Sequence, residues 1–289
     1  MAQIHFNRIY IIESLLNGDT LTGTNLHNDL LRYKSINHPD FKSILKTPKN
    51  KKEWDDVFVE IKNDCEENGN ASIIHFEIHG SKDGLRLTSE DSIKWDELYQ
   101  YLAPINSILH NELFVTFAVC YGAFFLKSSY INRQTAFRGF VGSFEPILVN
   151  DLVIRYESFY QELFSSFDLN KSYEQLVKSN PSLPNCYACF SAEYVFAYCY
   201  LEYLKMECTN QALVERAKQV MQDNNMNYNR TERRKFIKSF VKTEQNNSNR
   251  YFKQDYKTFF MLDLYPELES SIEFKDSIVD MKNWFKSLA

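Results

Sequence analysis

Two short segments of the sequence place a histidine and a cysteine where they could act together as a base and a nucleophile. His79-Gly80 closes the apolar segment at residues 73–78, and Cys120 closes a second apolar segment at residues 113–119. An imidazole beside a thiol takes up its proton or stands as imidazolium next to the thiolate, and either arrangement activates the sulfur at neutral pH. The two segments therefore predict a thiol site for acyl transfer.

Backbone groups of the same two segments could serve such a reaction. Gly80 has no side chain, so its N–H can approach a substrate carbonyl closely. The N–H of Cys120 lies at the expected start of the following helix. Together, the two N–H groups could form an oxyanion hole for the tetrahedral intermediate.

The elements that must position this pair alternate between strands and helices. Apolar runs predict buried strands at residues 9–12, 71–78, 113–119 and 137–142, with amphipathic helical segments between them. This order is typical of an α/β fold with a mainly parallel sheet and right-handed crossovers. In such a sheet, reactive groups gather at the carboxyl ends of the strands, so we expect His79 and Cys120 side by side if their strands are neighbours.

The second half of the chain is predicted to be helical. Five of the eight glycines lie between residues 80 and 142, and residues 143–289 contain none. Helical spacing covers residues 147–166, 169–179, 188–206, 209–223, 228–245, 250–264 and 272–287, and residues 245–249 form a polar connector. We therefore expect a sheet domain over residues 1–166 and an all-helical domain over 167–289, with the loop at 179–186 as the other candidate for the boundary.

Composition and charge exclude several classes of protein. The chain has 289 residues, 44% hydrophobic and 25% charged, which indicates a globular protein with ample material for a core. Its net charge of −5 argues against a general nucleic-acid binder. No run of 18 apolar residues predicts a membrane span. The first residues lack a secretory signal, so we expect a cytoplasmic protein whose six cysteines are reduced.

The motifs around the two reactive residues resemble those of the caspase-like cysteine peptidases, particularly the bacterial branch related to CHAT domains. IIHFEIHG (residues 73–80) resembles the family's strand ending in His-Gly, and LFVTFAVCYGA (residues 113–123) resembles its strand ending in the nucleophilic cysteine. His75 also fits a His-x-x-x-His-Gly form of the CHAT-type members. The resemblance covers roughly residues 1–165. It implies peptide-bond hydrolysis with Cys120 as nucleophile, His79 as general acid and base, oxyanion donors at Gly80 and Cys120, and no cofactor.

The resemblance also places a substrate pocket beside the segment FRGFVGSFEPI at residues 137–147. Arg138 and Glu145 lie near this predicted strand, and Asp83 lies in the loop after His79-Gly80. An arginine in the pocket would favour acidic substrates, whereas a carboxylate would favour basic ones. The substrate preference therefore stays open, and plain surface solvation is the alternative for all three residues.

Relatives in this bacterial branch are often effectors of antiviral or cell-suicide systems that stay inactive until a signal arrives. The resemblance therefore implies a regulated protease of proteins or peptides, with a nucleotide-like activator or a regulatory protein as partner. One alternative is a catalytically inactive ligand sensor or adaptor with the same sheet. Another is a nucleic-acid-associated factor that uses the basic residues of 230–257, although such a run is usually a solvated helix face.

Three further features have ordinary structural explanations. His75 lies four residues before His79 and is expected to be a packed core histidine. Glu77 shares their strand face and is expected to pair with a neighbouring polar group. Cys186 and Cys189 form a single Cys-x-x-Cys in an aromatic-rich segment, which favours core packing over a metal site.

Overall fold

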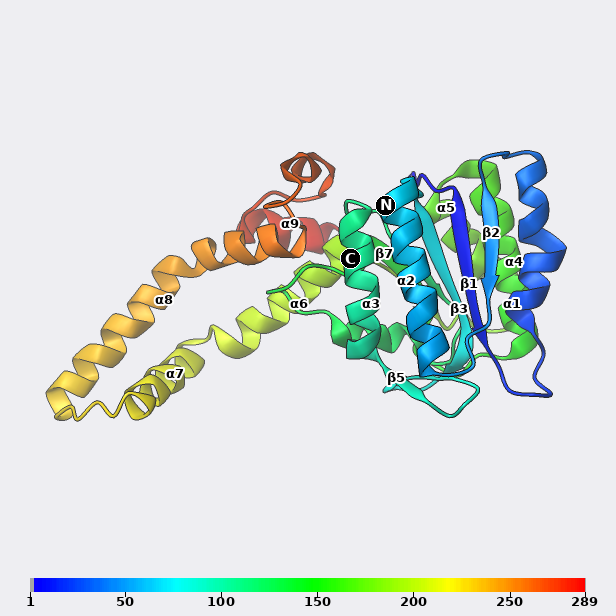
Figure 1. Ribbon diagram of the computed structural model, residues 1–289. Helices are drawn as coiled ribbons and strands as arrows, with labels where there is room; N and C mark the ends of the chain where they lie inside the picture. The colour runs from blue at the N-terminus through cyan, green and yellow to red at the C-terminus, as the bar shows by residue number, and fades with distance from the viewer. Residues whose placement is uncertain (1–2, 289) are drawn as a thin grey trace. The chain divides into compact units, whose positions relative to one another are not determined.

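A mixed sheet forms the centre of the N-terminal part of the chain. The computed structural model describes residues 3–288, and the sheet there has eight strands (Figure 1). Six of them follow the order β2-β1-β3-β6-β7-β8: β2 (Lys42–Lys46), β1 (Arg8–Ser14), β3 (Ser72–Gly80), β6 (Phe114–Phe117), β7 (Gly139–Ser143) and β8 (Tyr187–Ser191). Neighbours pair in parallel from β2 to β7, and β8 is antiparallel to β7. The predicted α/β fold with a mainly parallel sheet is confirmed.

Helices cover both faces of the sheet, which explains why its central strands are apolar nearly throughout. Figure 1 shows α2 (Lys51–Asn68) and α3 (Trp95–Ile108) on one face, and α4 (Val149–Ser166) and α5 (Leu169–Lys178) on the other. Side chains of β3 alternate between these layers: Phe76 stacks on Trp54 of α2, whereas His75 meets the ring edge of Tyr156 in α4. The layer with α4 also contains α1 (Thr22–Asn25) and the short helical turns that follow it, at Leu26–Leu30 and Leu31–Ile36.

A small antiparallel hairpin extends from the end of β3. Its strands are β4 (Gly84–Arg86) and β5 (Ser92–Lys94), and β4 pairs with the last two residues of β3. The hairpin therefore lies directly beside His79 and Gly80. Sequence patterning did not predict it, because strands of three residues are too short for a period of two to be recognised.

Two further strands were not predicted from the sequence. β2 lies in the segment between Pro39 and Pro48, and β8 occupies the start of the helix expected at residues 188–206. The helix prediction was wrong for residues 188–191, because pairing with β7 decides their conformation. Phe190 lies opposite Phe140, and their rings are 5.0 Å apart. Cross-strand packing of this kind outweighs local helical spacing.

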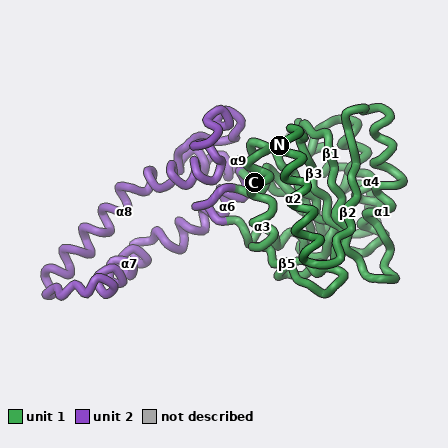
Figure 2. Tube along the Cα trace, viewed as in Figure 1, with its two compact units in different colours: residues 1–129, 135–192 green, residues 130–134, 193–289 purple. Residues whose placement is uncertain are grey.

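The chain divides into two compact units (Figure 2). The first holds the residues up to 129 and residues 135–192, and the second holds residues 130–134 and those from 193 on. The boundary falls after β8, later than the predicted positions at 166 and 179–186, because β8 belongs to the sheet. Beyond it the chain is helical, as expected, with α6 (Ala192–Glu207), α7 (Asn210–Asp223), α8 (Arg230–Phe259) and α9 (Ile278–Ser287).

An aromatic core holds the second unit together. Phe196 of α6 contacts Phe252, Tyr256 and Phe259 of α8, with ring centroids 5.1 to 6.1 Å apart. α8 is one helix of 30 residues, so the prediction of a connector at 245–249 was wrong. Its N-terminus carries a capping box formed by Asn229 and Glu232, which satisfies the first free N–H groups. None of the helices within residues 3–288 is both long and apolar enough to cross a membrane.

Candidate active site

The register between β3 and β6 brings the two predicted reactive residues to the same place. Ile73 lies opposite Phe114, and Phe76 lies opposite Phe117. The N–H of Ala118 still donates to the Phe76 carbonyl at 3.0 Å. The paired part of the strands ends there, and the same offset continued for three residues would place position 120 opposite position 79. His79 and Cys120 therefore leave neighbouring parallel strands at one edge of the sheet, as the sequence predicted.

Close packing of Gly80 against Cys120 joins the two motifs. A Cβ atom at position 80 would lie 2.2 Å from the Cys120 carbonyl oxygen and 2.2 Å from Cγ1 of Val119. No side chain fits in that space, so glycine is required here for steric reasons. The backbones of the His-Gly motif and of the cysteine turn are therefore in direct contact.

His79 has a carboxylate partner that sequence reasoning missed. Its Nε2 lies 2.8 Å from Oδ2 of Asp19, in the loop between β1 and α1. The same oxygen accepts the N–H of Leu16 at 2.9 Å. The hydrogen bond with His79 and then the one with Leu16 lower the pKa of the Asp19 carboxyl. Asp19 therefore stays ionised at neutral pH and holds the imidazole in one orientation.

The Asp19 contact also determines which imidazole nitrogen is available for chemistry. With its proton on Nε2 and donated to the carboxylate, the neutral ring has its lone pair on Nδ1. The His79 side chain is 40% exposed, so a substrate can reach it. This arrangement can accept a proton at Nδ1 while Asp19 stabilises the resulting imidazolium.

A tight turn presents Cys120 directly after β6. Tyr121 has a φ of +62°, and its N–H donates to the Glu145 carbonyl at 3.2 Å. The N–H of Ile147 donates to the Cys120 sulfur at 3.3 Å. The helix expected after the cysteine is a 3-10 helix, at Gly122–Ser128.

The two backbone N–H groups predicted as oxyanion donors are those of Gly80 and Cys120. The N–H of Ser81 donates to the Gly84 carbonyl, so alternation along the antiparallel ladder makes Gly80 and Leu85 a non-hydrogen-bonded pair. The Gly80 N–H therefore points away from β4 and toward the side of Cys120. No backbone carbonyl among residues 3–288 accepts the N–H of Cys120.

A cleft of about 490 Å³ borders His79. It lies between the end of β3 and the β4–β5 hairpin, and its lining includes Asp83 but not Cys120. Arg86 and Lys94 also line it, and Arg86 pairs with Glu90 at 3.2 Å. The cleft thus carries charges of both signs.

The other two predicted pocket residues lie in different places. Glu145 is beside the cysteine turn, since its carbonyl accepts from Tyr121 and its N–H is held by Ser143 at 3.0 Å. Arg138, in contrast, lies just before β7, at the amino end of the strands, and forms an ion pair with Glu112. Cys120 follows the carboxyl end of β6, so Arg138 is at the opposite edge of the sheet and does not line this site. Its position in the sequence next to a predicted pocket strand did not reveal at which end it lies.

A buried chain of polar groups supports the site from below. Nε2 of His75 lies 3.0 Å from Oε1 of Glu77, and Nδ1 lies 2.7 Å from the Thr116 hydroxyl, which in turn contacts the hydroxyl of Tyr160 at 2.8 Å. Burial raises the pKa of the Glu77 carboxyl. The expectation that His75 is a core histidine paired within the fold is therefore confirmed, and Glu77 is its partner.

The same buried carboxylate reaches the segment that carries Asp19. The hydroxyl of Thr22, the first residue of α1, donates to Oε2 of Glu77 at 2.7 Å. Glu13 of β1 accepts both the N–H and the hydroxyl of Thr24, at 2.9 and 2.6 Å. Two buried carboxylates therefore anchor the start of α1 and fix the loop in front of it.

Three of the five remaining cysteines have the environment of structural residues. Burial raises the pKa of Cys189 to about 12 and that of Cys199 to about 11, and it also raises the pKa of Cys186. Such thiols are protonated and unreactive at neutral pH. No group of three or more potential metal ligands occurs within the described range of residues 3–288.

The basic residues of 230–257 lie along α8, and most of them are exposed to solvent. Lys253 pairs with Asp276 at 2.9 Å. This is the ordinary arrangement of a solvated helix face.

The chain matches no protein-family model and no curated protein. The chemistry of the site is therefore inferred from its residues and their geometry.

Proposed function

We propose that this protein is a cysteine endopeptidase with Cys120 as nucleophile and His79 as general acid and base. One observation carries the proposal: the backbone of Gly80 packs against the carbonyl of Cys120, just beyond the paired part of the neighbouring parallel strands β3 and β6. A histidine and a cysteine that merely belonged to the core would need neither the shared sheet edge nor an exposed imidazole.

The reaction begins with transfer of the Cys120 proton to Nδ1 of His79. The thiolate then attacks the peptide carbonyl carbon, and the N–H groups of Gly80 and Cys120 hydrogen-bond the oxyanion that forms. The imidazolium donates its proton to the leaving amine as the C–N bond breaks, which leaves an acyl thioester on the sulfur. A water molecule gives a proton to Nδ1 and its hydroxide attacks the thioester. The sulfur then regains its proton from His79, and the acid product is released.

Asp19 acts as a positioning residue in this scheme. Its carboxylate accepts a hydrogen bond from Nε2–H and therefore fixes the tautomer in which the lone pair of Nδ1 is free. It also stabilises the positive charge on the ring in the steps in which His79 is protonated. Both effects act on the transition state, although the exposure of the pair limits their size.

Labelling of the thiols tests the proposal without knowledge of the substrate or of an activator. We expect a peptide-based electrophile to modify Cys120 faster than the five other cysteines, and His79→Ala to slow the reaction at Cys120 alone. Mass spectrometry of the labelled peptides measures both effects. Uniform reactivity of the thiols would contradict the proposal and favour an inactive sensor or adaptor.

Cleavage of a peptide library, with and without extract of stressed cells, tests the activity directly. Cys120→Ala should abolish cleavage. Cys186→Ala is the matched control, because that thiol is partly buried outside the site and its removal should leave cleavage unchanged. Cleavage that survives in Cys120→Ala would refute the assignment of the nucleophile.

A further inference from the structure

The helical unit contains a cavity of about 340 Å³ that lies among α6, α7, α8 and α9. This volume lies within the range of sites that take small organic molecules. All of its lining residues belong to the second unit, so the cavity is formed by that unit alone.

The floor of the cavity is apolar and tightly packed. Tyr200 and Leu213 are 1% and 3% exposed. The rings of Tyr200 and Tyr203 are 5.7 Å apart. Ile278 and Val279 of α9 lie at its border, and Val279 is 64% exposed even though it is a large apolar residue. A flat apolar body bound here would cover such surfaces.

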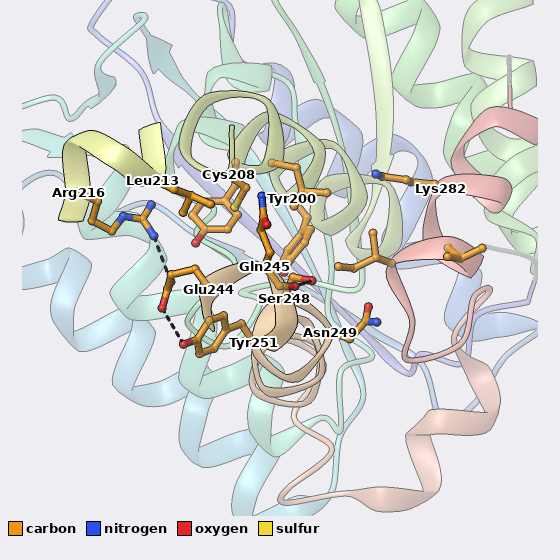
Figure 3. A pocket seen from close by; sticks show the side chains of 14 residues that line it. Tyr200, Cys208, Leu213, Arg216, Glu244, Gln245, Ser248, Asn249, Tyr251 and Lys282 are labelled. Atoms are coloured by element: carbon orange, nitrogen blue, oxygen red, sulfur yellow. Dashed lines mark hydrogen bonds and ion pairs between the residues drawn. The ribbon is translucent and has the colours of Figure 1, made fainter. Parts of the chain in front are cut away.

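The charged groups at one end of the cavity already satisfy one another. Arg216 lies 3.3 Å from Glu207 and 3.7 Å from Glu244, and the hydroxyl of Tyr251 donates to Glu244 at 3.2 Å. Figure 3 shows the contacts that link Arg216, Glu244 and Tyr251 on one side of the cavity. The charged groups at this end are therefore already paired and are not available to bind a charged group of a ligand.

The other end holds a cation without such partners. Lys282 extends toward the other lining residues in Figure 3, with Asn249 on the same side. Neither side chain has an ion pair or hydrogen bond to any of residues 3–288. An anionic group of a ligand would find the positive charge of Lys282 here.

The helix segment that faces the cavity has a composition that helix formation does not explain. Gln245, Ser248 and Asn249 line the cavity, and they belong to the run QNNSN that the sequence predicted to be a connector. Serine and asparagine are poor residues for the interior of a helix. Residues that break a local rule in this way are expected where their side chains have another role.

From these observations we propose that the cavity binds a small molecule with a planar apolar body and a single anionic group, which Lys282 holds. The apolar body lies against Tyr203 and Val279, the lining residues with accessible apolar surface. The proposal concerns the helical unit alone and does not depend on the activity of the sheet unit.

Titration of the full-length protein with 2-naphthoate tests the proposal, because this probe has a planar apolar body and one carboxylate. We expect saturable binding at one site by calorimetry, and a rise in the melting temperature with probe concentration, since a ligand of the native state stabilises it. The neutral isostere 2-naphthamide should bind more weakly by about threefold to tenfold, the value of one partly exposed charge interaction. Equal binding of the two probes would overturn the role of the anionic group.

Variants localise the binding. Lys282→Gln should weaken the binding of 2-naphthoate by about the same threefold to tenfold and leave the binding of 2-naphthamide unchanged. Lys286→Gln, one turn further along α9 and outside the lining, is the matched control. Val279→Trp should fill the mouth and abolish binding of both probes. No saturable binding below about 1 mM, or binding indifferent to Lys282→Gln and Val279→Trp, would refute the site.

Discussion

The hydroxyl of Thr22 donates a hydrogen bond of 2.7 Å to the buried carboxylate of Glu77. Glu77 belongs to the strand that ends in His79, and Thr22 begins the helix that follows Asp19. The contact therefore ties together the two segments whose side chains meet at the imidazole. The buried Glu77 therefore helps to hold the loop that carries Asp19 beside the imidazole of His79.

Asp19→Asn should slow alkylation of Cys120 by about tenfold or more, because general base catalysis by His79 depends on the tautomer that the carboxylate selects. The ¹⁵N chemical shifts of the imidazole should show the Nε2–H tautomer in the natural protein and a mixture in the variant. Asp29→Asn, at an exposed helical turn, is the control. An unchanged tautomer would remove Asp19 from the site.

Gly80→Ala should destabilise the sheet unit by about 1–3 kcal/mol, because the new Cβ overlaps the Cys120 carbonyl and must displace it. It should also abolish the selective reactivity of Cys120. Urea unfolding and thiol labelling measure the two effects. Gly69→Ala is the comparison: it lies at the end of α2, its φ of +63° makes alanine strained, and no neighbouring atom lies within 4 Å of the new Cβ. Reactivity should survive in Gly69→Ala, and its loss there would show that strain alone, without the overlap, accounts for the effect of Gly80→Ala.

Glu77→Gln should change how stability depends on pH. Burial raises the pKa of Glu77 in the folded protein above its ordinary 4.5, so its contribution to stability is present below that value and is lost as pH rises through the folded pKa. Between pH 4 and 8 the natural protein should therefore lose stability relative to Glu77→Gln. Urea unfolding at several pH values measures this difference, and parallel curves for the two proteins would show that the pKa of Glu77 is ordinary.

Asp255→Asn should stabilise the helical unit at neutral pH. Burial raises the pKa of this carboxyl to about 6, from 3.8. Its contribution is therefore present below 3.8 and is lost as pH rises through about 6. Because the side chain is partly solvated, we expect a gain of about 1 kcal/mol at pH 7 and none at pH 3.5. Thermal unfolding at the two pH values tests this, with Asp263→Asn as an exposed control.

The sequence predicted the positions of His79 and Cys120 because apolar runs mark the ends of buried strands. Their meeting then follows from the parallel pairing of those strands. Asp19 was missed because it lies 60 residues from His79 in the sequence. The two residues meet only because of which strand adjoins β3. The turn at Asn17-Gly18-Asp19 was nevertheless a usable signal, since the carboxyl end of β1 lies at the same sheet edge.

Other elements could not be found from local pattern because contacts between distant segments decide them. The local sequence pattern of β8 predicts the start of a helix, and its pairing with β7 makes it a strand. The middle of α8 reads as a connector, and packing of Phe252 and Tyr256 on α6 holds it helical. The fold class depends on the central strands, which are apolar on both faces, and those are the elements that the sequence describes best.

The close contact between Gly80 and the backbone of Cys120 has a consequence for how this pair of motifs can change over evolutionary time. The contacting atom of residue 120 is its main-chain oxygen, which every amino acid possesses. A descendant that lost its thiol would therefore still be destabilised by any larger residue at position 80. Glycine at this position reports how closely the two backbones pack, and only the residue at position 120 reports whether a descendant retains the thiol.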